Sequence, residues 1–164
     1  MDRLWSPWRY RYVAGEGKRS ATVCIFCELR DAPPADDERN LVVYRAQKNF
    51  IVLNLYPYTS GHLMIVPHEH VADLDAASKE ATDEMMDLAK KAQKVLREVY
   101  RPDGFNLGMN IGKAAGAGVA DHIHLHLMPR WIGDSNFMTT VGETRVLPED
   151  LAATYAKLRP HFER

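Results

Sequence analysis

His122-Ile123-His124-Leu125-His126-Leu127-Met128 alternates histidine with aliphatic residues near the middle of the second half of the chain. Successive side chains of an extended strand point to opposite faces, so this segment predicts a strand with three imidazoles on one face and an apolar back. An ordinary amphipathic strand would more naturally carry Thr, Lys or Glu on its polar face. The segment therefore predicts a functional surface.

The other histidines strengthen this interpretation, because six of the seven fall in two short stretches. The first stretch contains His62, His68 and His70, and the second contains the alternating segment. Imidazole titrates near neutral pH and can act as a nucleophile, an acid or a metal ligand. A catalytic row and a metal site that uses all three histidines of the segment therefore remain competing interpretations at this point.

The bulk composition limits the class of protein. With 164 residues, 46% hydrophobic and 26% charged, the chain fits one compact domain over residues 1–164. A formal net charge of -1 provides no general basic field, so we expect a small anionic ligand and no nucleic-acid partner. No stretch approaches the ~20 apolar residues of a membrane span, and the start lacks the apolar core of a signal peptide. We expect no membrane partner and a cytoplasmic location.

Strand patterns and one long helical pattern indicate the fold class. Strands are predicted over residues 41–44, 50–53, 63–66 and 105–111, followed by the strand that carries the three histidines. Apolar residues repeat at helical spacing over residues 78–100, with Ser78 as N-cap and Pro102 just beyond the end. Pro148 is expected to open a C-terminal helix that runs through Leu158. Strands grouped around one long helix favour an α+β fold with an antiparallel sheet of about five strands.

The chain is expected to divide into three parts. Residues 1–40 form an N-terminal arm that includes Cys24 and Cys27, residues 41–148 form the core, and residues 149–164 form the C-terminal helix. Residues 1–13 mix Trp and Tyr with Arg, and two interpretations of this segment stay open: an arm that packs on the main body or on a partner subunit, and a partly ordered tail.

The alternating segment has the pattern His, apolar, His, apolar, His, apolar, apolar, and in this the chain resembles the histidine triad family. Three segments are similar to nucleotide-binding elements of that family. They are Asn54-Leu55-Tyr56-Pro57, Gly61-His62-Leu63-Met64-Ile65-Val66-Pro67, and Asn110 with the glycine loop of residues 112–118. Three further segments resemble the bacterial diadenosine tetraphosphate phosphorylase and hydrolase branch of the family. They are Pro129-Arg130-Trp131, Gly133-Asp134-Ser135-Asn136-Phe137 and Leu4-Trp5-Ser6-Pro7-Trp8-Arg9. The resemblance covers roughly residues 41–148.

The resemblance implies a two-step reaction at an α-phosphorus. The middle histidine, His124, would be the nucleophile and would form a nucleotidyl-histidine intermediate. Splitting one displacement into two allows a second acceptor to attack the same atom. His126 would hydrogen-bond the phosphate oxygens and assist the leaving group. His122, at the first position, either orients the nucleophile or binds zinc in members of the family.

The resemblance also implies a set of substrate-binding residues. Backbone amides of residues 116–119, with Asn110 nearby, could form an anion-binding concavity, and Lys113 is a candidate phosphate contact. Asn54 corresponds to the family residue near the ribose, and His62 would lie beneath the triad. Gly118 stands where many members carry Ser or Gln. The substrate-binding candidates are Asn54, His62, Asn110, Lys113, Gly116, Gly118 and Val119.

Cys24 and Cys27 are the only cysteines of the chain. In a reducing compartment such a close pair more often binds metal or acts in redox chemistry than forms a structural disulfide. In zinc-bearing members of the family, and in the related galactose-1-phosphate uridylyltransferases, such a pair is joined by two histidines, which here correspond to His70 and His122. His68 is the alternative third ligand. The implied zinc would be structural, because four protein ligands leave no open position for water.

Three functions follow as expectations. The first is an enzyme that cleaves dinucleoside polyphosphates, with phosphate (phosphorylase) or water (hydrolase) as the acceptor. The second is a nucleoside phosphoramidate hydrolase, and the third is a nucleotide-sensing protein that binds without turnover. An intact His124 favours catalysis. The resemblance further implies a homodimer, no organic cofactor, and a place for magnesium only together with the substrate.

Overall fold

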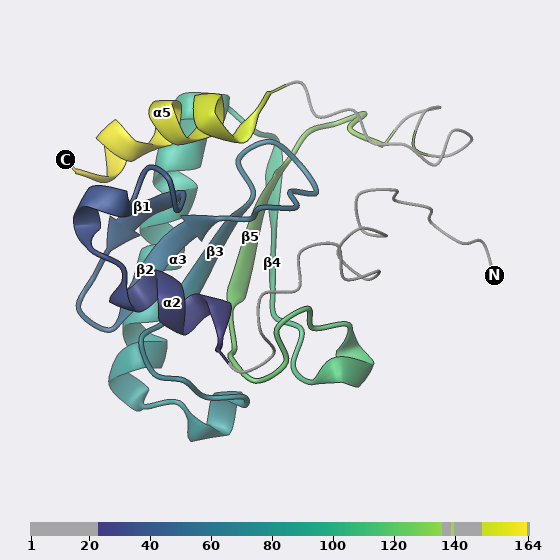
Figure 1. Cartoon of the computed structure of the whole chain (residues 1–164). Coiled ribbons are helices and arrows are strands. Elements are labelled where there is room, and N and C mark those ends of the chain that lie inside the picture. The colour runs from purple at the N-terminus through teal and green to yellow at the C-terminus, as the bar shows by residue number, and fades with distance from the viewer. Residues whose placement is uncertain (1–22, 136–138, 140–148, 164) are drawn as a thin grey trace.

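The computed structural model describes residues 23–135, 139 and 149–163 of the chain. Its centre is a five-stranded antiparallel sheet in the order β1-β2-β3-β5-β4. Figure 1 shows helices on both sides of this sheet, which confirms the predicted α+β class. The strands are β1 (Val42–Arg45), β2 (Asn49–Leu53), β3 (Leu63–Pro67), β4 (Gly104–Gly108) and β5 (Leu125–Arg130).

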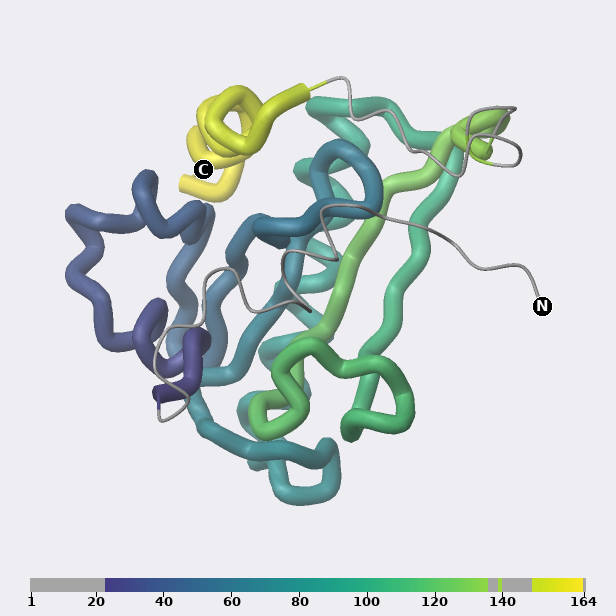
Figure 2. Tube along the Cα trace, turned by 45° about the vertical axis from the view of Figure 1, so that its right-hand side comes forward, coloured from purple at the N-terminus to yellow at the C-terminus, as the bar shows by residue number. Residues whose placement is uncertain are grey.

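Two cores lie on the two faces of the sheet. Alternate residues of β1, β2 and β3 face opposite ways, so nearly every residue of β2 and β3 is buried. The larger core packs against α3 (Lys79–Tyr100) and α5 (Leu151–Phe162). The smaller core lies under the short helix α2 (Ile25–Asp31), which covers the opposite face in Figures 1 and 2. The smaller core consists of Phe26, Val42, Phe50, Val52, Met64 and Val66.

Helix α3 has the ends that its sequence predicts. The hydroxyl oxygen of Ser78 accepts a hydrogen bond from the Ala81 amide at 3.2 Å, as an N-cap does. The helix ends at Tyr100, and Arg101 takes a left-handed conformation with φ of 48° immediately before Pro102. The buried stripe of α3 comprises Ala81, Met85, Leu88, Ala89, Ala92, Val95 and Leu96.

Gly61 shows how closely the loop before β3 approaches α3. Its φ is +75°, and an added Cβ would lie 3.1 Å from Leu96 and 3.2 Å from Tyr100. Glycine adopts such a conformation without steric cost, whereas a larger residue would be strained at this φ and would push the Leu96 and Tyr100 side chains aside by a few tenths of an ångström. This turn sets the position of the next residue, His62, at the start of β3.

Three predicted elements differ from the structure by more than one residue at an end. Strand β4 ends at Gly108, because the chain turns there into the glycine loop, where Gly112 has a φ of +77°. Strand β5 begins only at Leu125, so His122 and His124 precede the paired strand. Helix α5 begins at Leu151 with Asp150 as N-cap and continues past Leu158 to Phe162, which is buried against the larger core. Pro148 lies outside the described residues.

Short 3-10 turns complete the described part of the chain at Pro34–Asp36, Leu74–Ala76 and Lys113–Ala115. The aromatic and arginine-rich segment of residues 1–13 lies outside the described residues, and the division into arm, core and C-terminal helix stays a prediction. None of the helices within residues 23–135 and 149–163 has the length and apolarity required to cross a bilayer.

Candidate functional site

Within the described part of the chain, the His124 side chain makes its hydrogen bond to one backbone group. Its Nδ1 lies 3.0 Å from the carbonyl oxygen of His122. A carbonyl oxygen only accepts, so the proton of the neutral ring must be on Nδ1, and Nε2 carries a lone pair. Burial lowers the pKa of His124, which keeps the ring neutral near pH 7 despite the opposing effect of this hydrogen bond. The arrangement therefore produces a neutral imidazole with an unprotonated Nε2.

His126 has the opposite tautomer because of a relay through His62. The Tyr58 amide donates to Nδ1 of His62 at 3.2 Å, so the proton of the His62 ring is on Nε2. That Nε2 lies 2.9 Å from Nδ1 of His126 and donates to it. The remaining nitrogen of His126, Nε2, must then carry the proton of the neutral ring. Adjacent triad positions thus present a lone pair at His124 and an N–H donor at His126.

The rings of His124 and His126 lie side by side, with centroids 4.8 Å apart and an interplanar angle of 71°. The predicted alternation of imidazole and aliphatic side chains between two faces is confirmed here, because Leu125 and Leu127 lie in the larger core on the other face. Met64 of β3 pairs with His126, which places the row of imidazoles above the smaller core.

The loop between β2 and β3 supports His62. The side-chain oxygen of Asn54 accepts from the Tyr56 amide at 2.9 Å, and its nitrogen lies 3.4 Å from Nδ1 of His62. The ring of Tyr58 lies 5.0 Å from the ring of His62. Asn54 and His62, which were predicted as substrate-binding residues, therefore meet beside His126, and their contact with substrate stays a prediction.

Burial keeps these imidazoles neutral. Burial, together with the nearby His126 and His124, lowers the pKa of His62 to about 3. Burial, with His124 as the second cause, lowers the pKa of His126 to about 4. Protonating either ring would place a positive charge in a buried site next to other ionisable imidazoles, which both effects oppose.

This burial predicts an acid-sensitive contribution of His62 to stability. The pKa of His62 is about 3 in the folded chain and 6.5 in the unfolded chain. Its contribution to the free energy of unfolding is therefore complete above pH 6.5. The contribution is lost progressively as the pH falls toward 3, because the unfolded chain binds the proton first. By pH 5 the loss from this one group is about 2 kcal/mol. We expect the free energy of unfolding of His62→Gln, measured with urea, to fall less than that of the wild type between pH 7 and pH 5. Equal decreases in both proteins would contradict the prediction.

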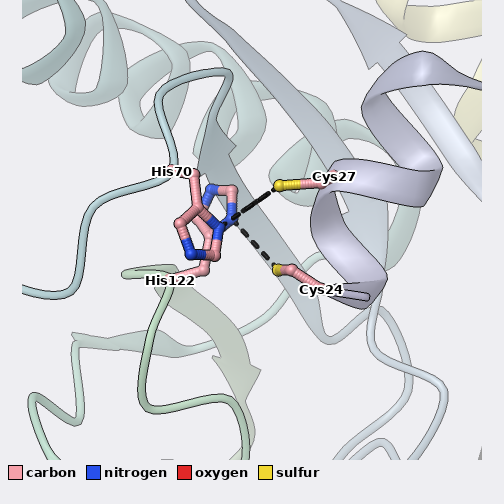
Figure 3. A group of neighbouring side chains, drawn as sticks. All are labelled: Cys24, Cys27, His70 and His122. Carbon is pink, nitrogen blue, oxygen red and sulfur yellow. Dashed lines mark hydrogen bonds between the residues drawn. The ribbon is translucent and has the colours of Figure 1, made fainter. Parts of the chain in front are cut away.

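A second group of side chains lies at the start of α2 (Figure 3). Cys24, Cys27, His70 and His122 each direct one ligand atom inward, and all four atoms lie within 4.8 Å of one another. Nδ1 of His122 is 3.3 Å from Sγ of Cys24 and 3.8 Å from Sγ of Cys27. Nδ1 of His70 is 3.3 Å from Sγ of Cys27. These four residues could hold a metal ion.

His122 is oriented for this role by its other nitrogen. Its Nε2 lies 2.9 Å from the carbonyl oxygen of Pro67, so Nε2 donates and Nδ1 faces the sulfurs with a lone pair. The alternative ligand His68 points elsewhere, since its Nε2 lies 3.2 Å from the Ala46 carbonyl and its ring stacks on Phe50. The structure thus groups His70 rather than His68 with the cysteines.

The glycine loop precedes His122, as expected, but it closes partly on itself. The amide of Gly116, which was predicted to contact phosphate, donates to the Lys113 carbonyl at 3.0 Å, and the Ala117 amide donates to Gly112. Val119 packs against the smaller core. A phosphate cradle formed by this loop, and the predicted contacts of Asn110, Lys113, Gly116, Gly118 and Val119, stay predictions.

Sequence reasoning missed the groups that orient the imidazoles. The amide of Tyr58 and the carbonyls of Pro67 and His122 are backbone groups, which leave no signature of residue type. The ring of Phe26 lies against His122 and His124, with centroids 5.4 Å and 4.9 Å away. Its position between the two cysteines was a visible signal, because a residue flanked by ligands of one site must lie near that site.

Known proteins are similar to this chain in sequence and in fold. The chain is 40% identical over 167 residues to an AP-4-A phosphorylase of Mycobacterium tuberculosis (strain ATCC 25618 / H37Rv), with coverage of 100% of this chain and 86% of that protein. It is similar to the crystal structure of a Zn-bound histidine triad family protein from Mycobacterium smegmatis, with a TM-score of 0.68 and 27% identity over 88% of this chain and 96% of that chain.

A hypothetical histidine triad nucleotide-binding protein from Sulfolobus tokodaii strain7 is also similar, with a TM-score of 0.66 and 26% identity over 85% of this chain and 92% of that chain. Residues 36–131 match the family model of the HIT domain, a range that contains the whole sheet and all three histidines of the alternating segment. The chain therefore belongs to the HIT domain family.

Proposed function

We propose that this protein is an enzyme that cleaves dinucleoside polyphosphates through a nucleotidyl intermediate on Nε2 of His124, with inorganic phosphate as the second acceptor. The observation that carries the proposal is the fixed pair of tautomers at His124 and His126. A protein that only bound nucleotide would not require an unprotonated imidazole nitrogen beside an imidazole N–H donor. The similarity to an AP-4-A phosphorylase supports this substrate class and phosphate as the acceptor.

In the first step the lone pair on Nε2 of His124 forms a bond to an α-phosphorus while the bond to the bridging oxygen breaks. The leaving nucleotide departs as an anion, and Nε2–H of His126 stabilises the charge that develops on phosphate oxygens. Positive charge develops on the His124 ring as the bond forms. The carbonyl of His122 stabilises that charge because it already accepts the Nδ1 proton at 3.0 Å.

In the second step the acceptor oxygen forms a bond to the same phosphorus, and the nitrogen–phosphorus bond breaks. His124 then returns to the neutral form with its proton on Nδ1. Phosphate as acceptor converts the transferred adenylyl group to ADP, whereas water converts it to AMP. Both acceptors use the same intermediate.

Incubation with diadenosine tetraphosphate, in the presence and absence of phosphate, tests the proposal. We expect ADP plus ATP when phosphate is present and little product without it, as resolved by anion-exchange chromatography. Release of AMP plus ATP at equal rates in both reactions would show water to be the acceptor and overturn phosphorolysis. Absence of turnover with both acceptors, in a protein that still binds the nucleotide, would overturn the enzymatic function itself.

We also propose that the cysteine and histidine group holds a structural zinc ion. Zn–S distances of about 2.3 Å and Zn–N distances of about 2.0–2.1 Å at tetrahedral angles place sulfur and nitrogen ligands roughly 3.5 Å apart. Three of the four sulfur–nitrogen separations, at 3.3, 3.3 and 3.8 Å, fit this requirement, and all four ligand atoms lie within 4.8 Å of one another. Two thiols and two imidazoles are a donor set that zinc prefers, and the similarity to a Zn-bound protein supports the assignment.

The zinc ion would supply structural cross-linking rather than chemistry at phosphorus. Cys24 and Cys27 come from α2, His70 from the segment after β3, and His122 from the segment before β5. The four ligands thus join three parts of the chain that are far apart in sequence. Their connection fixes α2 against the edge of the site.

A further inference from the structure

Phe26 links the metal-binding group to the nucleophile. It lies between Cys24 and Cys27 in sequence, it is the buried residue of α2, and its ring also lies against His122 of the metal-binding group. The Phe26 side chain is only 4% exposed. Its ring centroid is 4.9 Å from that of His124, with an interplanar angle of 49°. Any displacement of this part of α2 therefore changes what lies against the His124 ring.

The hydrogen bond at Nδ1 does not by itself fix the His124 ring. One bond to the His122 carbonyl determines the tautomer, but the ring can still tip about the line that joins the two atoms. Phe26 lies against the ring at 4.9 Å and His126 at 4.8 Å. These two neighbours limit the tilt, and the tilt sets the direction in which the Nε2 lone pair points.

The two ends of α2 are held differently. The far end is fixed by Arg45, which donates to the carbonyls of Leu29 and Arg30 at 2.9 and 3.0 Å and forms an ion pair with Asp37. At the near end the N-cap residue, Cys24, provides no side-chain capping hydrogen bond. A helix of seven residues is too short to be stable by itself. The near end, which carries Phe26, is held by burial of that ring in the smaller core and by the contacts that its two thiols make.

We propose that Phe26 is a positioning residue that holds the His124 ring in its attacking orientation, and that metal binding by Cys24 and Cys27 holds Phe26 in place. The catalytic part of this inference rests on the proposed function. Occupancy of the metal site then controls the rate of nucleotidyl transfer to His124 without any contact between metal and substrate. An imidazole displaced by about 1 Å loses on the order of 100-fold in rate, so loss of the support has a measurable effect.

Phe26→Leu and Phe50→Leu form a matched pair for the kinetic test. Both remove a buried ring from the same smaller core, but Phe26 lies against the His124 ring, whereas Phe50 stacks on His68. For Phe26→Leu we expect the single-turnover rate of intermediate formation from diadenosine tetraphosphate to fall at least about tenfold, with KM changed less than about threefold. Phe50→Leu should keep the rate within about threefold despite comparable thermal destabilisation. Equal rates in the two variants would overturn the proposal.

A second measurement requires no substrate and is therefore independent of the proposed function. The Cε1–H signal of His124 is recorded by NMR in the zinc-loaded protein and after treatment with a chelator, with and without Phe26→Leu. We expect chelation to shift this signal in the wild type and to shift it much less in Phe26→Leu. An unchanged signal in the wild type, or equal shifts in both proteins, would overturn the coupling even if the enzymatic reaction is confirmed.

Discussion

His124→Ala is expected to lower the turnover of diadenosine tetraphosphate by on the order of 10⁴-fold or more, because the variant lacks the atom that bonds to phosphorus. Binding of the nucleotide should change far less, since the other residues proposed to contact phosphate are intact. After acid-free quenching, mass spectrometry should detect a nucleotidyl adduct on His124 in the wild type and none in the variant. Turnover within about tenfold of the wild type would remove His124 from the nucleophilic role.

A matched control for this variant is His161→Ala. His161 lies on α5, where it is 3.2 Å from Glu98 of α3. Both helices pack on the larger core, on the face of the sheet opposite the three histidines. This control should retain wild-type turnover. His124 is 5% exposed, so its replacement also removes buried volume, and the thermal midpoint of both variants must be measured. An adduct found on a histidine other than His124 would contradict the assignment directly.

Replacement of a metal ligand is expected to have the second large effect, on zinc content and on the melting temperature. A metal held at a free concentration about 1,000-fold above its dissociation constant stabilises the folded chain by about 4 kcal/mol. For a chain of this length, that corresponds to roughly 8–16 °C in the melting temperature. We expect His70→Gln and Cys27→Ser to lose stoichiometric zinc and to melt lower by an amount in this range. Elemental analysis and calorimetry provide the two measurements.

His68→Gln is the discriminating control for the metal site. His68 lies two residues from His70, but its Nε2 donates to the Ala46 carbonyl, so its replacement should leave zinc bound. Loss of zinc from this variant together with retention in His70→Gln would reverse the ligand assignment. Wild-type protein that contains no stoichiometric zinc when purified without chelator would overturn the zinc proposal.

The periodic parts of the fold could be predicted from the sequence. The long helix from Ser78 to Tyr100 was correct at both ends because capping and proline signals coincide with the apolar stripe. Strands β1, β2 and β3 were placed within a residue or so, since their apolar runs are bounded by turn residues. The cysteine and histidine group was also predictable, because zinc-binding residue types are recognisable in the sequence once the resemblance has been noted.

The parts that could not be predicted depend on backbone geometry and on packing. The tautomers of His124 and His126 are set by one carbonyl and one amide, which any residue type supplies. Helix α5 passes through Pro160 to Phe162, although proline usually ends a helix, because burial of Phe162 and a hydrogen bond from Lys91 to its carbonyl stabilise the final turn. Neither effect has a local sequence signal.

The late start of β5 affects the tautomer of His124. Pairing with β3 begins at Leu125, so the His122 carbonyl lies outside the ladder and is available to a side chain. Extending the sheet by three residues, back to His122, would bring these backbone groups into strand pairing, which would compete with the hydrogen bond that sets the tautomer of His124. Reactivity at this position thus depends on where a strand begins, a property that an alignment of residue types does not record.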